Sequence, residues 1–221
     1  MRTILKTSLV AIALLIGVSA SAQDTPITFG VKVGANLSNF SGDLDMDAKF
    51  GFNAGVTLDY AFTPDVYLLT GLEFTTKGAK RKTGDNSFTM NPMYLQLPIH
   101  VGYKLTVADN TRLVFHAGPY VAYGLGGKTT TKTAGIKTKG DFFGSEKDGG
   151  YKRFDFGVGL GVGAEFGKIN VGLGYDFGLL NIARGGYEGS FDLGDFGTIE
   201  IESSDYKVRN MNAYLTVGYK F

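Results

Sequence analysis

A period-two alternation of apolar residues with small or polar ones recurs eight times along this chain, and it limits what the chain can fold into. The clearest case is 153–166, where Phe, Val, Leu and Ala alternate with glycines and charged residues. Successive side chains of a β-strand point to opposite faces, so this spacing predicts strands with one apolar and one polar face. The predicted strands are 29–38, 50–60, 66–77, 95–104, 113–123, 153–166, 169–179 and 211–221.

The connections between these segments alternate in length. The short ones are 63–65, 107–111 and 167–168, and the long polar ones are 41–48, 78–91, 126–150 and 183–206. Short periplasmic turns and long external loops are typical of outer-membrane barrels. We therefore expect an all-β fold, an eight-stranded antiparallel up-and-down transmembrane β-barrel with short periplasmic turns and long extracellular loops. Pro98 and Pro119 lack a ladder donor, which predicts a bulge or irregularity in the fourth and fifth strands.

Alternation alone leaves open which face points outward, so a soluble lipocalin-like barrel is the alternative. An eight-stranded barrel is only just wide enough for side chains to fill, and large apolar residues from every strand would overfill it. On the outside in water, the same residues would exceed the few hundred Å² of apolar patch that monomers tolerate. The apolar face is therefore expected to meet lipid. The interfacial aromatic residues are expected to be Tyr60, Tyr103, Tyr123, Phe166, Tyr175 and Tyr219.

The start of the chain resembles a secretory signal peptide over residues 1–22. Arg2 and Lys6 precede an apolar run at 9–18, and Ala22 ends a small-residue cleavage site. The run is too short to span a bilayer. We expect a single outer-membrane β-barrel domain at 23–221, in the bacterial outer membrane. The chain has no cysteine, hence no disulfides, and its net charge of +1 gives no electrostatic footprint for nucleic acid.

Charged residues of both signs fall on the face predicted to point into the barrel. They are Lys32, Asp59, Glu73, Lys104, Arg153, Asp155, Glu165, Asp176 and Lys220. Buried charges are costly unless they are paired and hydrogen-bonded. This near-balanced set therefore predicts a salt-bridge network that plugs the interior. A narrow polar passage is the alternative.

His100 and His116, the only histidines, lie symmetrically about the turn near Ala108 and fall on the inward face. Such a pair could bind a metal or act as an acid–base site with a carboxylate. No carboxylate shares their local motif, so we expect both to join the interior hydrogen-bond network. The spacing also singles out no Ser, His and acid set. We therefore predict no catalytic, metal or cofactor site, and no enzymatic activity.

Four glycines, Gly157, Gly159, Gly161 and Gly163, alternate along the sixth predicted strand. No helix follows them, which argues against a phosphate-binding loop. Glycine within a strand allows close backbone approach and curvature, both of which a small barrel requires.

Several short motifs carry a family resemblance. They are Tyr94-Leu95-Gln96-Leu97-Pro98, Ala117-Gly118-Pro119-Tyr120, Arg153-Phe154-Asp155-Phe156-Gly157, Gly178-Leu179-Leu180-Asn181-Ile182 and Gly218-Tyr219-Lys220-Phe221. With them the chain resembles the PorT-like family of Bacteroidetes outer-membrane β-barrel proteins, also described as the porin family. The resemblance implies a barrel over most of the mature chain, and one subset of that family is linked to protein secretion and gliding. Phe221 resembles the C-terminal signal recognised by the barrel-assembly machinery.

These observations predict an integral outer-membrane barrel with a structural or interaction-mediating role and external loops as its contact surface. Its expected partners are outer-membrane lipid, the barrel-assembly machinery during insertion and a protein bound through the extracellular loops. An accessory role in outer-membrane protein secretion, a narrow porin-like channel and a lipid-modifying barrel enzyme are the alternatives.

Fractionation of cells tests the expected lipid-facing surface. The processed polypeptide should sediment with membranes and require detergent for extraction, because its apolar face cannot be exposed to water. Recovery of a detergent-free monomer from the periplasm would contradict this expectation.

Overall fold

The computed structural model describes residues 26–144, 150–184, 189–192, 198–201 and 207–221. The predicted signal peptide at 1–22 lies outside these residues and stays a prediction. No helix in the described part of the chain is long and apolar enough to cross a membrane.

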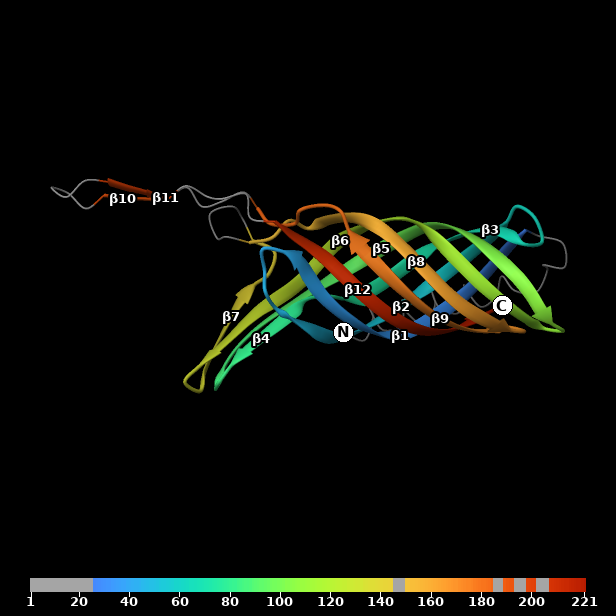
Figure 1. Ribbon diagram of the computed structural model, residues 1–221, viewed down its shortest axis with the longest axis horizontal. Helices are drawn as coiled ribbons and strands as arrows, with labels where there is room; N and C mark the ends of the chain where they lie inside the picture. Colours follow the sequence, from blue (N-terminus) through green and yellow to red (C-terminus); the bar gives the residue numbers. More distant parts are fainter. Residues whose placement is uncertain (1–25, 145–149, 185–188, 193–197, 202–206) are drawn as a thin grey trace, which may run out of the picture.

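Eight long strands wind around a common axis and form the wall of a barrel (Figure 1). They are β1 (Ile27–Gly42), β2 (Asp47–Ala61), β3 (Val66–Thr76), β5 (Asn86–Ala108), β6 (Thr111–Thr133), β8 (Phe154–Phe166), β9 (Ile169–Gly178) and β12 (Val208–Lys220). Each pairs antiparallel with the next wall strand, and β1 pairs with β12 from Gly30↔Lys220 to Gly42↔Val208. The sheet is therefore closed, and the predicted eight-stranded up-and-down architecture is confirmed.

Burial along the wall strands is the reverse of that in a soluble β-protein. On β8, Phe154 and Leu160 point outward and are each 51% exposed, whereas Asp155 is fully buried inside. The same alternation of exposed apolar and buried polar residues recurs on β1, where Val33 is 62% exposed and Asn36 is 2% exposed. An apolar outer wall over a polar interior is stable only where lipid surrounds the wall.

The periplasmic end is closed by tight turns. Asn110 and Gly167 adopt left-handed φ values of 59° and 58° in the β5–β6 and β8–β9 turns, and the Gly167 amide donates to the Asn110 carbonyl at 2.8 Å. Asn and Gly tolerate this conformation at low cost. Of the predicted interfacial residues, Phe166 lies beside the β8–β9 turn and Tyr60 lies at the periplasmic end of β2, and both are exposed on the lipid side.

Two of the expected long loops, 78–91 and 126–150, are largely strand, which corrects the prediction. Strands β5 and β6 continue past the barrel rim and pair there with β4 (Ala79–Thr83) and β7 (Ile136–Asp141). We call β4, β7, residues 86–91 and residues 128–133 the extension sheet. It protrudes at the end of the barrel opposite the C-terminus (Figure 1).

The extension sheet is stabilised by two-residue hairpin turns. Ala134 and Gly135 both have positive φ, 49° and 83°, as a type I′ turn requires, and Gly84 has φ 59° in the β4–β5 turn. Polar residues lie on both faces of these strands, with Lys on one face and Thr on both, so no apolar alternation marks them in the sequence. In the expected 183–206 connection, β10 (Gly189–Asp192) pairs with β11 (Thr198–Ile201).

The prolines interrupt pairing without shifting its register. The β3–β5 ladder passes from Thr70↔Ile99 to Glu73↔Gln96 with no pair at Pro98, and the register is the same on both sides. The register shifts of the β5–β6 ladder lie instead between Met93/Tyr94 and Thr106/Ala108. The fourth predicted strand is thus irregular as expected, but its bulges are not at the proline.

The glycines of β8 leave room for large inward side chains of neighbouring strands. A Cβ atom on Gly161 would lie 2.4 Å from the His116 ring, and one on Gly157 would lie 2.6 Å from the Tyr120 ring. Both distances are shorter than any normal contact. The role predicted for these glycines, close approach inside a narrow barrel, therefore has a direct steric basis.

Gly161→Ala should lower the free energy of unfolding by about 1–3 kcal/mol, because the new methyl group overpacks the interior against His116. Gly140→Ala is the matched control, since a Cβ there meets nothing within 4 Å and its effect should stay within about 0.5 kcal/mol. Urea unfolding in detergent micelles, followed by the heat-modifiable gel shift, measures both. Equal stability of the two variants would contradict this packing account.

Candidate functional site

The interior of the barrel holds polar side chains in three layers, named here from the periplasmic end as the periplasmic, middle and external layers. The periplasmic layer comprises Asp59, Lys104, Arg112, Glu165 and Lys220. The middle layer comprises Lys32, Glu73, Gln96, His100, His116, Asp176 and Asn212. The external layer comprises Lys77, Tyr94, Tyr120, Asp155 and Asn210.

The periplasmic layer joins three cations to two carboxylates. Lys220 bonds Asp59 at 2.5 Å and also bonds Glu165. Lys104 lies 3.3 Å from Asp59 and 3.7 Å from Glu165. Arg112, which the sequence analysis missed, lies 3.0 Å from the second Glu165 oxygen. The alternation on β6 could have identified it, because Arg112 is four residues before the inward His116.

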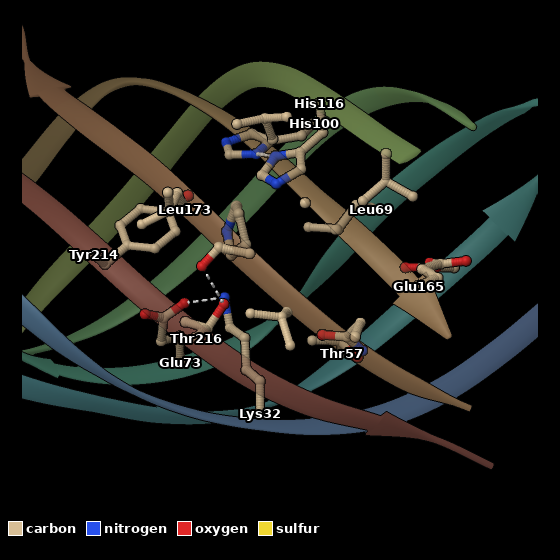
Figure 2. Close-up of a pocket in the computed structure, with 18 of the residues that line it drawn as sticks. Lys32, Thr57, Leu69, Glu73, His100, His116, Glu165, Leu173, Tyr214 and Thr216 are labelled. Carbon is tan, nitrogen blue, oxygen red and sulfur yellow. Dashed lines mark hydrogen bonds and ion pairs between the residues drawn. The ribbon is translucent and has the colours of Figure 1, made fainter. Parts of the chain in front are cut away.

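The middle layer contains one ion pair and the histidine pair. Lys32 of β1 is paired with Glu73 of β3, and both residues are in register with Gly55 of the β2 strand between them. The Nδ1 atoms of His100 and His116 are 2.9 Å apart and the rings are stacked, so each histidine is the other's hydrogen-bond partner. Figure 2 shows the imidazoles on one side of the lumen and the Lys32–Glu73 pair on the other. The structure thus brings both histidines to the interior, next to each other.

Asp176, also in the middle layer, is held by amides. Gln96 Nε2 donates to Asp176 Oδ2 at 3.1 Å and Asn212 Nδ2 donates to the same oxygen at 3.4 Å. Asn36 Nδ2 donates in turn to Asn212 Oδ1 at 2.7 Å. This network reaches from β5 through β9 and β12 to β1 and ties distant wall strands together.

A fully buried lysine occupies the external layer. Lys77 Nζ lies 3.6 Å from Asp155 Oδ2, 4.6 Å from the Tyr120 ring centroid and 5.5 Å from that of Tyr94. Tyr120 and Asn210 donate to Asp155 Oδ2 at 3.2 and 2.9 Å. Lys77 is not among the predicted interior charges, although it continues the inward series of Glu73 and Thr75 on the third predicted strand.

An apolar cluster, the aromatic cap, closes the barrel above the external layer. Its buried members are Phe40, Ala79, Met90, Tyr94, Tyr120, Ala122, Phe142, Phe143, Ile182, Ala183 and Val208. Phe142 stacks on Tyr151 with centroids 4.4 Å apart, and Phe143 meets the Tyr94 edge at 5.5 Å. Phe143 lies directly over Gly124. The adjacent phenylalanines of the predicted polar loop 126–150 were the available signal for this cap, and the sequence analysis did not use it.

Arg153 was predicted to belong to the interior charge network, and the structure places it at the external rim. It donates to the Gly124 carbonyl at 2.7 Å and its guanidinium lies 5.1 Å from the Phe143 ring centroid. Within the described residues Arg153 therefore supports the aromatic cap rather than a charged layer. Phe221 lies at the periplasmic end, where its amide donates to the Phe29 carbonyl at 2.9 Å.

A polar cavity of about 70 Å³ lies between the periplasmic and middle layers. Its charged and imidazole lining is Lys32, Asp59, Glu73, His100, His116, Glu165, Asp176 and Lys220. This volume holds a few waters and no larger ligand. No group of three His, Asp or Glu side chains that could hold a metal ion occurs within the residues the structure describes.

The chain is similar in fold to several solved outer-membrane proteins. It is 13% identical to Neisserial surface protein A over 87% of this chain and 97% of that one, with a TM-score of 0.42. It is 15% identical to Ail, the attachment invasion locus protein of Yersinia pestis, over 88% and 98%, with a TM-score of 0.39. For OprG from Pseudomonas aeruginosa the identity is 12% over 89% and 97%, with a TM-score of 0.39.

No curated protein matches the sequence. The model of a protein family described as the outer membrane protein beta-barrel domain matches residues 21–184. This match spans most of the chain and includes every wall strand except β12. The chain therefore belongs to the outer membrane protein beta-barrel domain family and resides in the bacterial outer membrane.

Proposed function

We propose that this protein is a plugged, non-conducting barrel that holds the extension sheet outside the cell as a contact surface for an extracellular partner. One observation carries the proposal: side chains fill the lumen from the periplasmic layer to the aromatic cap, while strands of the wall continue beyond the rim. A rigid scaffold that presents its variable connections is a common arrangement for binding proteins.

The layers oppose conduction by electrostatics as well as by volume. An ion entering the lumen would have to separate buried pairs such as Lys77–Asp155, both fully buried, and Lys32–Glu73. Removing one partner of a buried pair typically costs about 3–5 kcal/mol. The described lumen offers the ion only a 70 Å³ cavity, so the narrow-channel alternative has less support.

Enzymatic chemistry also has less support from the described residues. A catalytic histidine must bond a nucleophile and be oriented by a further group. Here His100 and His116 bond each other, and their rings stack against the glycine face of β8. We infer a structural role for both histidines.

The motifs resemble the PorT-like family of Bacteroidetes barrels, one subset of which is linked to protein secretion, so an accessory role in secretion is the second candidate. Tyr94 and Asp155, which stand in two of those motifs, both lie in the external layer. The motifs that carry the resemblance therefore contribute residues to the barrel interior. Both candidate functions require that interior, so the resemblance does not distinguish between them. Affinity pull-down from detergent-solubilised membranes distinguishes them, because components of an export apparatus would copurify only with an accessory.

Planar-bilayer recording tests the plug. The wild-type protein should show no steady single-channel steps, and Phe142→Ala/Phe143→Ala should stay closed, because it removes the cap and leaves all three charged layers. Steady, large steps from the wild type would overturn the plugged interior. Opening of the double variant alone would show that the cap, not the charged layers, closes the lumen.

Ile136→Ser tests the contact surface, since Ile136 is 73% exposed at the tip of the extension sheet. It should weaken capture of the extracellular partner by roughly tenfold, the effect of losing one apolar anchor of about 1.4 kcal/mol. The matched control is Val107→Ser, an exposed apolar residue at the periplasmic end. Equal capture by both variants would place the contact elsewhere.

Asp155→Leu should lower the free energy of unfolding by about 3–5 kcal/mol, because it leaves the buried Lys77 charge unpaired. Adding Lys77→Met should restore much of that loss, since replacing both partners with apolar side chains removes the unpaired charge. Heat-modifiable gel shifts measure both variants, and partner capture should stay unchanged. A double variant no more stable than Asp155→Leu would argue against the Lys77–Asp155 pair.

A further inference from the structure

The lysines of the extension sheet gather on one of its faces. Strand register places them in rows across the sheet: Asn91, Lys128 and Asp141; Asp47, Lys80, Thr89, Thr130 and Lys139; Lys82, Ser87, Lys132 and Lys137. Ala79 and Met90, in the row between the first two lysine rows, are buried in the aromatic cap, which marks the opposite face of the sheet as the inner one. The lysine rows therefore point outward, and we call them the lysine face.

The lysine face continues the lipid-facing wall of the barrel. On β6 the exposed Tyr123 and Leu125 are the last apolar outward residues, and Lys128 follows Leu125 by three residues, or about 10 Å along the strand. Because the strands are tilted, the height of Lys128 above the apolar belt is less than this distance along the strand. The headgroup zone of a bilayer is about 5–8 Å thick on each side. The row of Lys128 thus stands at the level of the lipid headgroups, and the rows of Lys139 and Lys132 follow two and four residues further along β6.

The charges on this face are not balanced by the protein. The six lysines face two carboxylates, Asp47 and Asp141, among the described residues of these rows. Lys128 bonds Asp141 at 2.6 Å, and this hydrogen bond lowers the pKa of the exposed Asp141 carboxyl. The remaining lysines lie close together: Lys132 is directly opposite Lys137, and Lys139 is two residues further along β7.

Like charges directly opposite each other destabilise an antiparallel pair. The repulsion between Lys132 and Lys137 therefore destabilises the sheet when nothing is bound, and a bound anion would remove this repulsion. The hydroxyls of Ser87, Thr89 and Thr130 stand between the lysines in the same rows and can donate hydrogen bonds to phosphate oxygens. A sheet of ammonium and hydroxyl groups above an apolar wall has the charge and position to complement phosphorylated lipid headgroups.

From this geometry we propose that the lysine face binds the phosphorylated headgroups of outer-leaflet glycolipid. This inference extends the proposed function and rests on the extension sheet being external. The outward face of the sheet would contact the membrane, and its tip and inner face would remain free to bind the extracellular partner. The lipid is favoured over a soluble polyanion because the lysine rows and the apolar wall form one continuous surface.

Amine footprinting of the full-length mature chain in nanodiscs tests this assignment. Nanodiscs are made of phosphatidylcholine alone, or with lipid A, or with dephosphorylated lipid A, and acylation of each lysine is read by mass spectrometry. Lys128 and Lys139 should be protected by lipid A at least about fivefold, which corresponds to about 1 kcal/mol per lysine at an anionic surface, and Lys132 and Lys137, in the row furthest from the wall, should be protected less. Dephosphorylated lipid A should give no protection.

Matched charge variants locate the effect. Lys137→Gln/Lys139→Gln should bind lipid A roughly tenfold or more weakly and should expose Lys132 to acylation. Arg81→Gln/Lys207→Gln removes the same charge from outside the lysine face and should leave protection of Lys132 unchanged. The heat-modifiable gel shift shows that both variants fold, and Ile136-dependent partner capture in phosphatidylcholine nanodiscs reports separately on the proposed function.

Three results would overturn the proposal. The first is equal protection by lipid A and its dephosphorylated form. The second is protection by soluble heparin in phosphatidylcholine nanodiscs with none by lipid A, which would assign the face to a soluble polyanion. The third is equal loss of protection in both charge variants. In each case intact partner capture would leave the proposed function standing.

Discussion

Lipid offers no hydrogen-bond partner to a backbone N–H or C=O, and the antiparallel ladder between β1 and β12 therefore supports the rest of the structure. This ladder removes the two edges that an eight-stranded sheet would otherwise expose to hydrocarbon, and the Phe221–Phe29 hydrogen bond extends it to the end of the chain. Once the sheet is closed, one face of every strand must be interior. The size of that interior, set by the strand count, then limits which side chains can occupy it.

The narrow interior explains the pairing of large side chains with glycines. Tyr67 lies over Gly102, Tyr214 over Gly174 and His116 over Gly161, each at a distance that a Cβ atom would prohibit. The narrow interior also constrains the charged residues. They are removed from water there, so they must form ion pairs and hydrogen bonds with one another. A shared layer such as Asp59 with Lys104 and Lys220 satisfies that requirement. Volume and charge together fill much of the described lumen with side chains, and this filling is the basis for proposing the external surface as the place for function.

The wall strands could be predicted because lipid imposes a simple rule on them. Outward positions such as Val33 and Leu160 must be apolar along the whole membrane span, so the period-two pattern is unbroken. Beyond the rim no hydrocarbon surrounds the strands, so the rule no longer applies. Residues 128–133 and 136–141 accordingly carry mainly polar residues on both faces, with Lys on one face and Thr on both. The alternation predicts no strand there, although these residues form ladders as regular as those of the wall.

The sequence predicts which residues lie in the interior better than it predicts which of them pair with one another. Alternation assigned Lys32 and Glu73 to the inward face. It also applies to Lys77, the last residue of the third predicted strand, and it would apply to Arg112 if the fifth predicted strand began one residue earlier. It could not show that Lys77 meets Asp155, since those residues are far apart in the chain and are brought together by closure. The aromatic cap likewise joins Phe40, Phe142 and Val208 from separate strands.

The sequence by itself determined that the chain forms membrane-spanning strands with an apolar outer and a polar inner face, because side-chain alternation is a local property of each strand. Only the tertiary structure decided which interior charges pair, that an apolar cap covers them, and that six lysines form one outward face. Those outcomes depend on strand register, and register is fixed by closure of the whole sheet rather than by any single segment.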